Sequence, residues 1–233
     1  GEKSTYNFSI GYLDQEGTVE GNEFRRFTAR LQNDFLAFDF LKIGYTITGA
    51  MNNSQDIPGG IFHELYSASP ITPVYYADGT YGDPNDYKAG SSNLFNPQVT
   101  LDFFDQESKN YRMTGNVFAE LTFLKNFTFR TSLGGDFGEN ELRNYAPQYA
   151  ATLAQRRSVS LLRRERSETR NWILENTLTY SNQDSEDHGI TVLLGQGAQQ
   201  YRFYKLETTA ENVPNNSEGD HYLTLGNPGT RFV

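Results

Sequence analysis

Apolar and polar residues alternate most regularly over residues 110–138. In the first half of this stretch every second residue is apolar or small, and the residues between them are mostly polar. The alternation breaks at Leu124, Lys125 and Asn126 and then resumes at Phe127. Because side chains alternate faces along a β-strand, the pattern predicts a β-hairpin with one apolar and one polar face.

Both arms of this predicted hairpin are long. Each runs past about ten residues, whereas strands of globular proteins usually have about five or six and transmembrane strands need roughly 9–11. Aromatic residues lie near the arm ends, at Tyr111 and Phe123 and at Phe127 and Phe137. At about 3.3 Å per residue and ~45° tilt, these pairs are roughly 28 Å and 23 Å apart along a barrel axis. Since the apolar band of an outer-membrane barrel is ~25 Å tall, the hairpin is predicted to cross a membrane.

The same alternation recurs along the chain and predicts an all-β fold. The predicted strands lie near 5–13, 24–34, 40–50, 109–123, 127–137, 169–181 and 188–204. Short connections (35–39, 124–126 and 182–187) alternate with long ones (14–23, 51–108 and 139–168), and 205–233 is a loop-like tail. Outer-membrane barrels have short periplasmic turns and long extracellular loops.

This pattern favours an antiparallel transmembrane β-barrel segment of about seven long strands, within a single barrel domain over 1–233. An odd number of strands does not close a bacterial antiparallel barrel, so the segment is expected to belong to a larger one. The chain opens directly into a strand, as expected of an internal fragment.

Composition narrows the class of partner. The net charge is −9 and the pI about 4.9, which argues against nucleic acid as the main partner. The mean hydropathy of −0.64 resembles that of a soluble protein, but a barrel with half its strand residues facing water has the same value. The absence of cysteine excludes disulfides and thiolate metal sites. No run of 18 apolar residues is present, so no membrane helix is predicted.

Several segments resemble a known family of transporters. They are Gly11-Tyr-Leu-Asp-Gln-Glu-Gly17, Phe24-Arg-Arg-Phe-Thr-Ala-Arg-Leu31, Phe38-Asp-Phe-Leu-Lys-Ile-Gly44, Pro73-Val-Tyr-Tyr-Ala-Asp-Gly79, Asn176-Thr-Leu-Thr-Tyr180 and His188-Gly-Ile-Thr-Val-Leu-Leu-Gly-Gln196. Their order and spacing resemble the barrel of SusC/RagA-type TonB-linked outer-membrane transporters, across essentially the whole chain.

The resemblance implies a 22-stranded barrel with an N-terminal plug in the outer membrane of Bacteroidetes-type bacteria. It also implies a SusD-like surface lipoprotein lid, energy supplied by TonB, and import of oligosaccharides or peptides. Full members of the family are several times longer. The plug, the TonB box and the carboxypeptidase-like extension are not among these residues, so coupling to TonB is an inference from the resemblance.

The two faces of the predicted strands suggest two sets of functional residues. Membrane-girdle aromatics are expected at Tyr6, Tyr12, Phe123, Phe127, Phe137, Trp172 and Tyr180. Lumen-facing charges are expected at Arg26, Arg30, Arg112, Glu120 and Arg130. These charges either line the permeation path or form salt bridges and hydrogen bonds with the plug.

An acidic and aromatic cluster lies inside the long loop 51–108. Its tyrosines are candidates for stacking on sugars or contacting a partner, and the predicted substrate- or partner-binding residues are Tyr75, Tyr76, Asp78, Tyr81 and Tyr87. Calcium binding through Asp78, Asp83 and Asp86 is a weaker alternative, because their spacing does not match an EF-hand loop. Turn structure combined with partner contact is the favoured interpretation, and no metal site is predicted.

A basic run extends from Arg156 to Arg170 in an otherwise acidic chain. One interpretation is an extracellular loop that contacts lipid phosphates, the lipoprotein or an anionic substrate. The favoured interpretation is a set of solvated loop charges, partly neutralised by Glu165 and Glu168.

Catalysis has little support in the sequence. His63, His188 and His221 are scattered without metal-ligand spacing, and no nucleophile motif or phosphate-binding glycine loop is present. The chain is therefore predicted not to be an enzyme and to need no cofactor. Two alternatives to the transporter are a secreted carbohydrate-binding β-sandwich and a passive porin-like barrel. A sandwich has shorter strands with turns every 8–12 residues, and this chain lacks that spacing.

Overall fold

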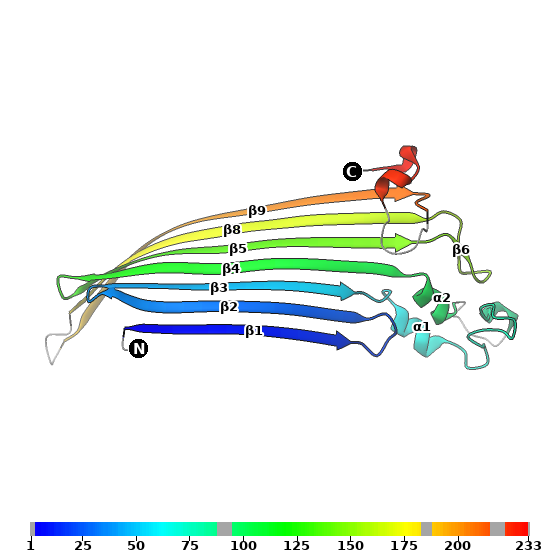
Figure 1. The fold of residues 1–233 in the computed structure, drawn as a ribbon, viewed down its shortest axis with the longest axis horizontal. Coiled ribbons are helices and arrows are strands. Elements are labelled where there is room, and N and C mark those ends of the chain that lie inside the picture. Colours follow the sequence, from blue (N-terminus) through cyan, green and yellow to red (C-terminus); the bar gives the residue numbers. More distant parts are fainter. Residues whose placement is uncertain (1–2, 88–94, 183–187, 215–221, 233) are drawn as a thin grey trace.

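Seven long antiparallel strands form one continuous curved sheet (Figure 1). The computed structural model describes residues 3–87, 95–182, 188–214 and 222–232. The sheet order is β1-β2-β3-β4-β5-β8-β9, so each long strand pairs with the long strand that precedes or follows it in the chain. The predicted antiparallel sheet of about seven long strands is confirmed. The strands are β1 (Ser4–Glu16), β2 (Glu23–Phe38), β3 (Leu41–Gln55), β4 (Asp105–Phe123), β5 (Phe127–Ala146), β8 (Leu161–Asn182) and β9 (Ile190–Glu211).

The short turns lie at one end of the sheet and the long connections at the other (Figure 1). Between β4 and β5, Leu124 and Lys125 both have positive φ, at 48° and 58°. Such a turn matches the right-handed twist of the two strands that it joins. The turn predicted at 182–187 falls mostly on 183–187, outside the described residues.

The strands are longer than the apolar alternation predicts. In the segment predicted as loop 51–108, β3 continues to Gln55 and β4 begins at Asp105. Between these strands lie two short helices and a 3-10 turn: α1 (Ile61–Ser67), η1 (Pro84–Asp86) and α2 (Pro97–Asp102). None of the described helices has the length and apolar character needed to cross a membrane.

The other two predicted loops also differ from the structure. Residues 139–168 were predicted as loop, but β5 extends to Ala146 and β8 already begins at Leu161. In the predicted tail 205–233, β9 continues to Glu211. The extensions carry charged cross-strand pairs in place of apolar alternation, and a backbone ladder needs no apolar side chains to continue. The remaining elements are β6 (Tyr149–Ala150), β7 (Arg156–Arg157), η2 (Leu223–Leu225) and η3 (Pro228–Thr230).

Buried apolar side chains gather at the end with the long connections. A small cluster there contains Tyr145, Leu162, Ala210 and Val213, each at most 3% exposed. The Tyr145 hydroxyl donates a hydrogen bond to the Val213 carbonyl oxygen at 3.0 Å, so the chain after β9 folds back onto the sheet. The remaining buried apolar residues among those described are Val19, Ile61 and Val99. Over most of its length the sheet is therefore a single layer.

Candidate functional site

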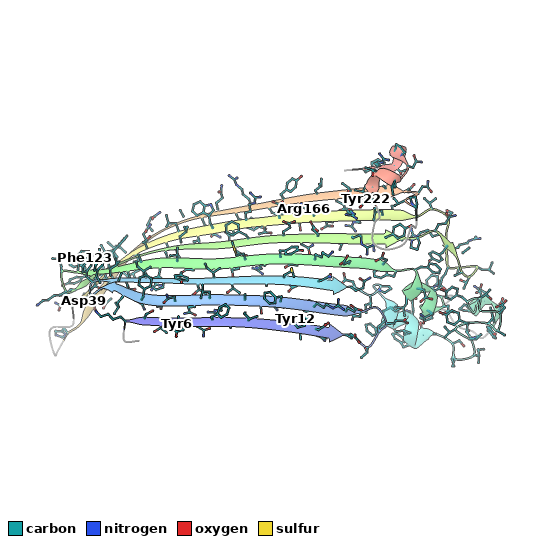
Figure 2. The ribbon with its side chains drawn as sticks, viewed as in Figure 1. Tyr6, Tyr12, Asp39, Phe123, Arg166 and Tyr222 are labelled. Carbon is teal, nitrogen blue, oxygen red and sulfur yellow. The ribbon has the colours of Figure 1, made fainter. Side chains whose placement is uncertain are left out.

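The sheet has two chemically different faces. Residues directly opposite each other on antiparallel strands share a face, so the register assigns each side chain to one of them. The apolar face, defined here as the one that carries Val117 and Leu133, also carries all seven predicted girdle aromatics. Figure 2 labels three of them, Tyr6, Tyr12 and Phe123. Val117 and Leu133 are 45% and 48% exposed although both are apolar. An apolar surface of this extent indicates an interaction with another apolar phase, and the girdle role of the aromatics stays a prediction.

The apolar residues shift along the strands from one side of the sheet to the other. On β1 the apolar residues end, on the side of the short turns, at Tyr6. The residues directly opposite one another from strand to strand form a row, and the row of Tyr6 runs through Val117 on β4 to Ala198 on β9. On β9 they continue beyond Ala198 to Ile190, with one polar exception, Gln196, which accepts a hydrogen bond from the Asn176 side chain at 2.8 Å.

This shift measures the tilt of the strands relative to the apolar band. It amounts to about eight residues over six strand steps, or about 40° of tilt at ~3.3 Å per residue and ~4.8 Å between strands. Membrane barrels have strand tilts of 35–45°. When the strands have the tilt of a membrane barrel, the apolar band therefore lies parallel to the membrane plane.

The opposite face, called the polar face below, carries all five predicted lumen charges. Arg112 donates two hydrogen bonds to the Asp136 carboxylate, at 3.0 and 2.8 Å. Arg130 is 3.3 Å from the Glu120 carboxylate, and its guanidinium lies 4.0 Å from the centroid of the Phe118 ring. The polar face therefore neutralises much of its charge through pairs between neighbouring strands.

Two other predicted lumen residues lie on β2. Arg30 donates a hydrogen bond to the side-chain oxygen of Gln32 at 3.2 Å. Arg26 has no hydrogen bond or ion pair within the described part of the chain, and it is exposed. Whether these side chains line a permeation path stays a prediction.

The long connections form a compact unit, called the cap here and defined as described residues 56–87, 95–104 and 147–160. Within it, Tyr75 and Tyr81 form a β-bridge, and both hydroxyls donate to the same Asp102 carboxylate oxygen, at 3.1 and 2.7 Å. Burial and this hydrogen bond raise the pKa of Tyr81 well above its ordinary value. A stacked pair, Phe103 and Tyr149 with ring centroids 4.1 Å apart, continues the aromatic cluster from Tyr81.

Two further residues of the predicted binding cluster stabilise local turns. The Tyr76 hydroxyl donates to Asp86 at 2.6 Å and accepts from the backbone amide of Asp83 at 3.0 Å. The Asp78 carboxylate accepts from the backbone amide and hydroxyl of Thr80, at 3.0 and 2.7 Å. These two hydrogen bonds lower the pKa of Asp78.

The five predicted binding residues therefore differ in solvent exposure. Tyr75 is 46% exposed, whereas Tyr76, Tyr81 and Tyr87 are partly buried and Asp78 is an exposed turn residue. Binding by this cluster stays a prediction, and Tyr75 is its most accessible aromatic ring.

The carboxylates considered for calcium have protein partners. Asp83 is 8% exposed and accepts from the backbone amides of Leu153 and Asn85, at 2.8 and 2.9 Å. Burial acts to raise the pKa of Asp83, but these hydrogen bonds outweigh it and the pKa is lowered. Among the described residues there is no group of three or more His, Cys, Asp or Glu side chains that fits a metal ion.

A buried pair of amide side chains joins the two parts of the cap. Asn96 and Gln155 are 3% and 6% exposed. The Asn96 backbone amide donates to the Gln155 side-chain oxygen at 2.7 Å, and the Gln155 side-chain nitrogen donates to the Asn96 carbonyl oxygen at 3.0 Å. The Asn96 side chain also donates to the carbonyl oxygens of Val74 and Gly82. Sequence reasoning missed this pair, and its one local signal was the Asn-Pro step at Asn96.

The basic run lies mostly on β8 and not in a loop, which corrects the prediction. Arg166 is 2.7 Å from Glu139 on β5, and Arg170 is 2.9 Å from Glu168. Arg163 is 2.8 Å from Glu207 on β9. The predicted partial neutralisation by Glu165 and Glu168 therefore occurs along β8 itself, and Glu139 and Glu207 on the neighbouring strands add to it.

Comparisons with known proteins find similarity to TonB-dependent receptors. No family model matches the chain. TonB-dependent receptors P26 and P39 of Formosa agariphila are 22% and 25% identical to it, each over 97% of the chain. TonB-dependent receptor SusC of Bacteroides thetaiotaomicron is 24% identical over 62% of the chain. The RagAB peptide importer in its open-open state matches the whole chain with a TM-score of 0.73 at 20% identity.

The chain is therefore similar to part of the SusC/RagA-type TonB-dependent receptors. It spans 23%, 21% and 17% of the lengths of the three receptors, and 26% of the matched RagAB chain. The sheet therefore has the fold of a piece of the RagA barrel.

The chain also presents apolar side chains in its cap that the sequence did not single out. Phe62, Tyr66 and Ile71 are 60%, 76% and 56% exposed. Nearby, Leu65 and Phe95 contribute to the lining of a groove of about 200 Å³. Such side chains are typical of a protein-binding surface. They lack a sequence signal because α1 has seven residues, too few to show a helical period.

Proposed function

We propose that this receptor fragment forms part of the barrel wall of a TonB-dependent nutrient importer in a bacterial outer membrane. The observation that carries the proposal is the apolar band, which lies parallel to the membrane plane when the strands have the tilt of a membrane barrel. An apolar face toward lipid and a polar face toward an aqueous lumen are what such a wall needs. The relatives are receptors and importers, in agreement with a role in transport.

In this proposal the whole chain belongs to one barrel domain of 22 strands. Its seven strands supply lipid-facing wall and lumen surface, and its chemistry is binding without bond making. The girdle aromatics lie at the two membrane interfaces, and the paired charges of the polar face contact the plug or the passing substrate. Energy comes from TonB acting on a plug outside this segment. The substrate is an oligosaccharide or a peptide, and the peptide importer RagAB favours the latter by analogy.

The cap supplies the proposed surface for a SusD-like surface lipoprotein. Tyr75, Phe62 and Tyr66 are exposed aromatic residues at the end where the long connections lie. Aromatic residues are enriched in protein interfaces because they bury a large apolar area at a small entropic cost. Asn96 and Gln155 hold this surface in place through buried hydrogen bonds.

Fractionation of cells that produce the full-length receptor tests the proposal. We expect a heat-modifiable band in the outer membrane that co-purifies with a surface lipoprotein, together with uptake that is lost in a strain without TonB. Uptake independent of TonB would indicate a passive porin. Recovery of the protein alone in the secreted fraction would indicate a sugar-binding module instead.

A double substitution, Phe62→Ser with Tyr66→Ser, tests the lipoprotein surface separately. We expect loss of lipoprotein co-purification with normal membrane insertion, because both side chains are exposed and support no buried core. Leu124→Ser is a matched control, since Leu124 is 78% exposed in a turn at the opposite end. Unchanged co-purification in the double variant would contradict this placement of the partner.

A further inference from the structure

A broad groove crosses the apolar face and ends at the arginines of β8. Its volume is about 580 Å³, and its lining includes Ala29, Gly49 and Met113 from the central strands. Arg166 and Arg170 line the same groove from β8. One continuous surface therefore joins an apolar floor to two guanidinium groups.

The groove exists because small residues occupy its floor. Gly49 lies between Ala29 and Met113 in the same row of the sheet. A Cβ atom added at Gly49 would meet no atom within 4 Å, so the space above this glycine is open. A width of several strands and an apolar floor suit the acyl chains of a lipid.

The row that contains Gly49 begins within the apolar band at β3 and lies outside the band at β9. It runs through Met113 and Phe137 to Arg170 on β8 and Arg202 on β9. Because the apolar residues shift toward the short turns between β1 and β9, the β3 end of this row lies within the band and the β9 end lies beyond it. The arginines are therefore at the level of lipid headgroups, on the side of the long connections.

Charge at this end of the groove favours an anion. Arg170 and Arg202 are directly opposite each other on β8 and β9, and like charges in this position repel. Arg170 pairs with Glu168 at 2.9 Å, and Arg166 pairs with Glu139 at 2.7 Å and approaches Glu168 at 3.7 Å. Within the described residues Arg202 has no such carboxylate partner. Arg166 also lies opposite Glu141 on β5, whereas Arg170 and Arg202 have only Glu168 between them, and a phosphate between Arg170 and Arg202 relieves their repulsion.

We propose that this groove binds a phosphate-bearing anionic lipid of the outer leaflet, with its acyl chains over Gly49 and its phosphate at Arg170 and Arg202. The proposal rests on the proposed function, because it needs the apolar face to contact the membrane. It adds a specific lipid ligand to a wall that otherwise contacts lipid through its apolar side chains.

Lipid binding to the purified full-length receptor tests this site. The probes are monophosphoryl lipid A, the same lipid without its phosphate, and inorganic phosphate as a competitor, with bound lipid counted by native mass spectrometry. We expect the phosphorylated lipid to bind more tightly, and Arg170→Gln and Arg202→Gln each to weaken it about tenfold, the effect of losing one charge-assisted hydrogen bond. Gly49→Leu is expected to reduce binding of both lipids, because its side chain fills the groove.

Arg25→Gln is the matched control, since Arg25 is an exposed arginine on the same face that does not line the groove. Equal binding of the two lipids, or equal effects of Arg25→Gln and Arg170→Gln, would overturn the proposal. Competition by inorganic phosphate at the lipid's own concentration would also overturn it, because the acyl chains would then contribute nothing. Heat modifiability of the same samples is read separately, so failure of membrane insertion is distinguished from failure of the lipid site.

Discussion

The wall and the cap of this fragment are stabilised in different ways. The wall is a single layer in which apolar side chains such as Ile10 and Met113 remain 61% and 52% exposed. In the cap, Ile61 and Val99 are fully buried, and polar groups such as Asn96 are buried with their hydrogen bonds satisfied. A sheet must bury one face against something. The contrast indicates that the wall needs a second layer from outside this chain, which lipid supplies in the proposed function, whereas the cap contains its own core.

The largest expected effect comes from a charge on the apolar face of the wall. Val117→Arg is expected to cost about 2–4 kcal/mol, as for arginine near the bilayer midplane. Asn116→Arg is the matched control, because Asn116 is the exposed neighbour on the polar face. Folding titrations of the full-length receptor in lipid vesicles measure both. Equal costs at the two positions would remove the distinction between the faces.

The next largest effect concerns the buried amide pair of the cap. Gln155→Ala leaves the Asn96 backbone amide buried without its acceptor, which costs about 1–3 kcal/mol. We expect faster proteolysis in the cap with no change in the wall. Gln98→Ala is the control, because the Gln98 side chain makes its hydrogen bond to Asp102 in an exposed position. If protease cleaved the cap of Gln155→Ala more slowly than the cap of Gln98→Ala, the cap would not depend on this pair.

A pH-dependent effect is expected at Asp83. Because its pKa in the folded cap lies below the ordinary 3.8, the ionised carboxylate stabilises the cap. This contribution is complete above the ordinary pKa and is lost as the pH falls through the lowered one. Cap protection in hydrogen exchange should therefore differ between wild type and Asp83→Asn at neutral pH, and the difference should vanish in strong acid.

Asp39→Asn provides the control for that measurement, since Asp39 lies in the turn between β2 and β3 with its side chain 98% exposed. It should leave cap protection unchanged at every pH. A difference between Asp83→Asn and wild type that grew on acidification would contradict the assigned hydrogen bonds.

The smallest effect is expected on the polar face of the wall. Asp136→Asn weakens the pair with Arg112, whose side chain is 60% exposed. Exposed ion pairs contribute about 0.2–1 kcal/mol, so the vesicle titration should change little. A loss as large as that of Val117→Arg would show that the polar face is dry, and would contradict its assignment to an aqueous lumen.

Much of the wall could be predicted from the sequence because its signal is local. Alternation with a period of two depends on neighbouring residues, so Tyr111 and Phe123 could be assigned to one face and Arg112 and Glu120 to the other. The strand ends could not be predicted in the same way. Beyond the apolar band, pairs such as Arg143 with Asp105, 2.6 Å apart on β5 and β4, continue the sheet without any apolar period.

The sequence by itself determined the strand segments, the two faces and the resemblance to SusC/RagA-type transporters, since these depend on residues close together in the chain. Tertiary structure alone decided the stagger of the apolar band, the pairing of Asn96 with Gln155, and the meeting of Gly49 with Arg170 along one groove. Each of these joins residues from different strands or loops. Their contact depends on strand register, and the register is set by the pairing of all seven strands together.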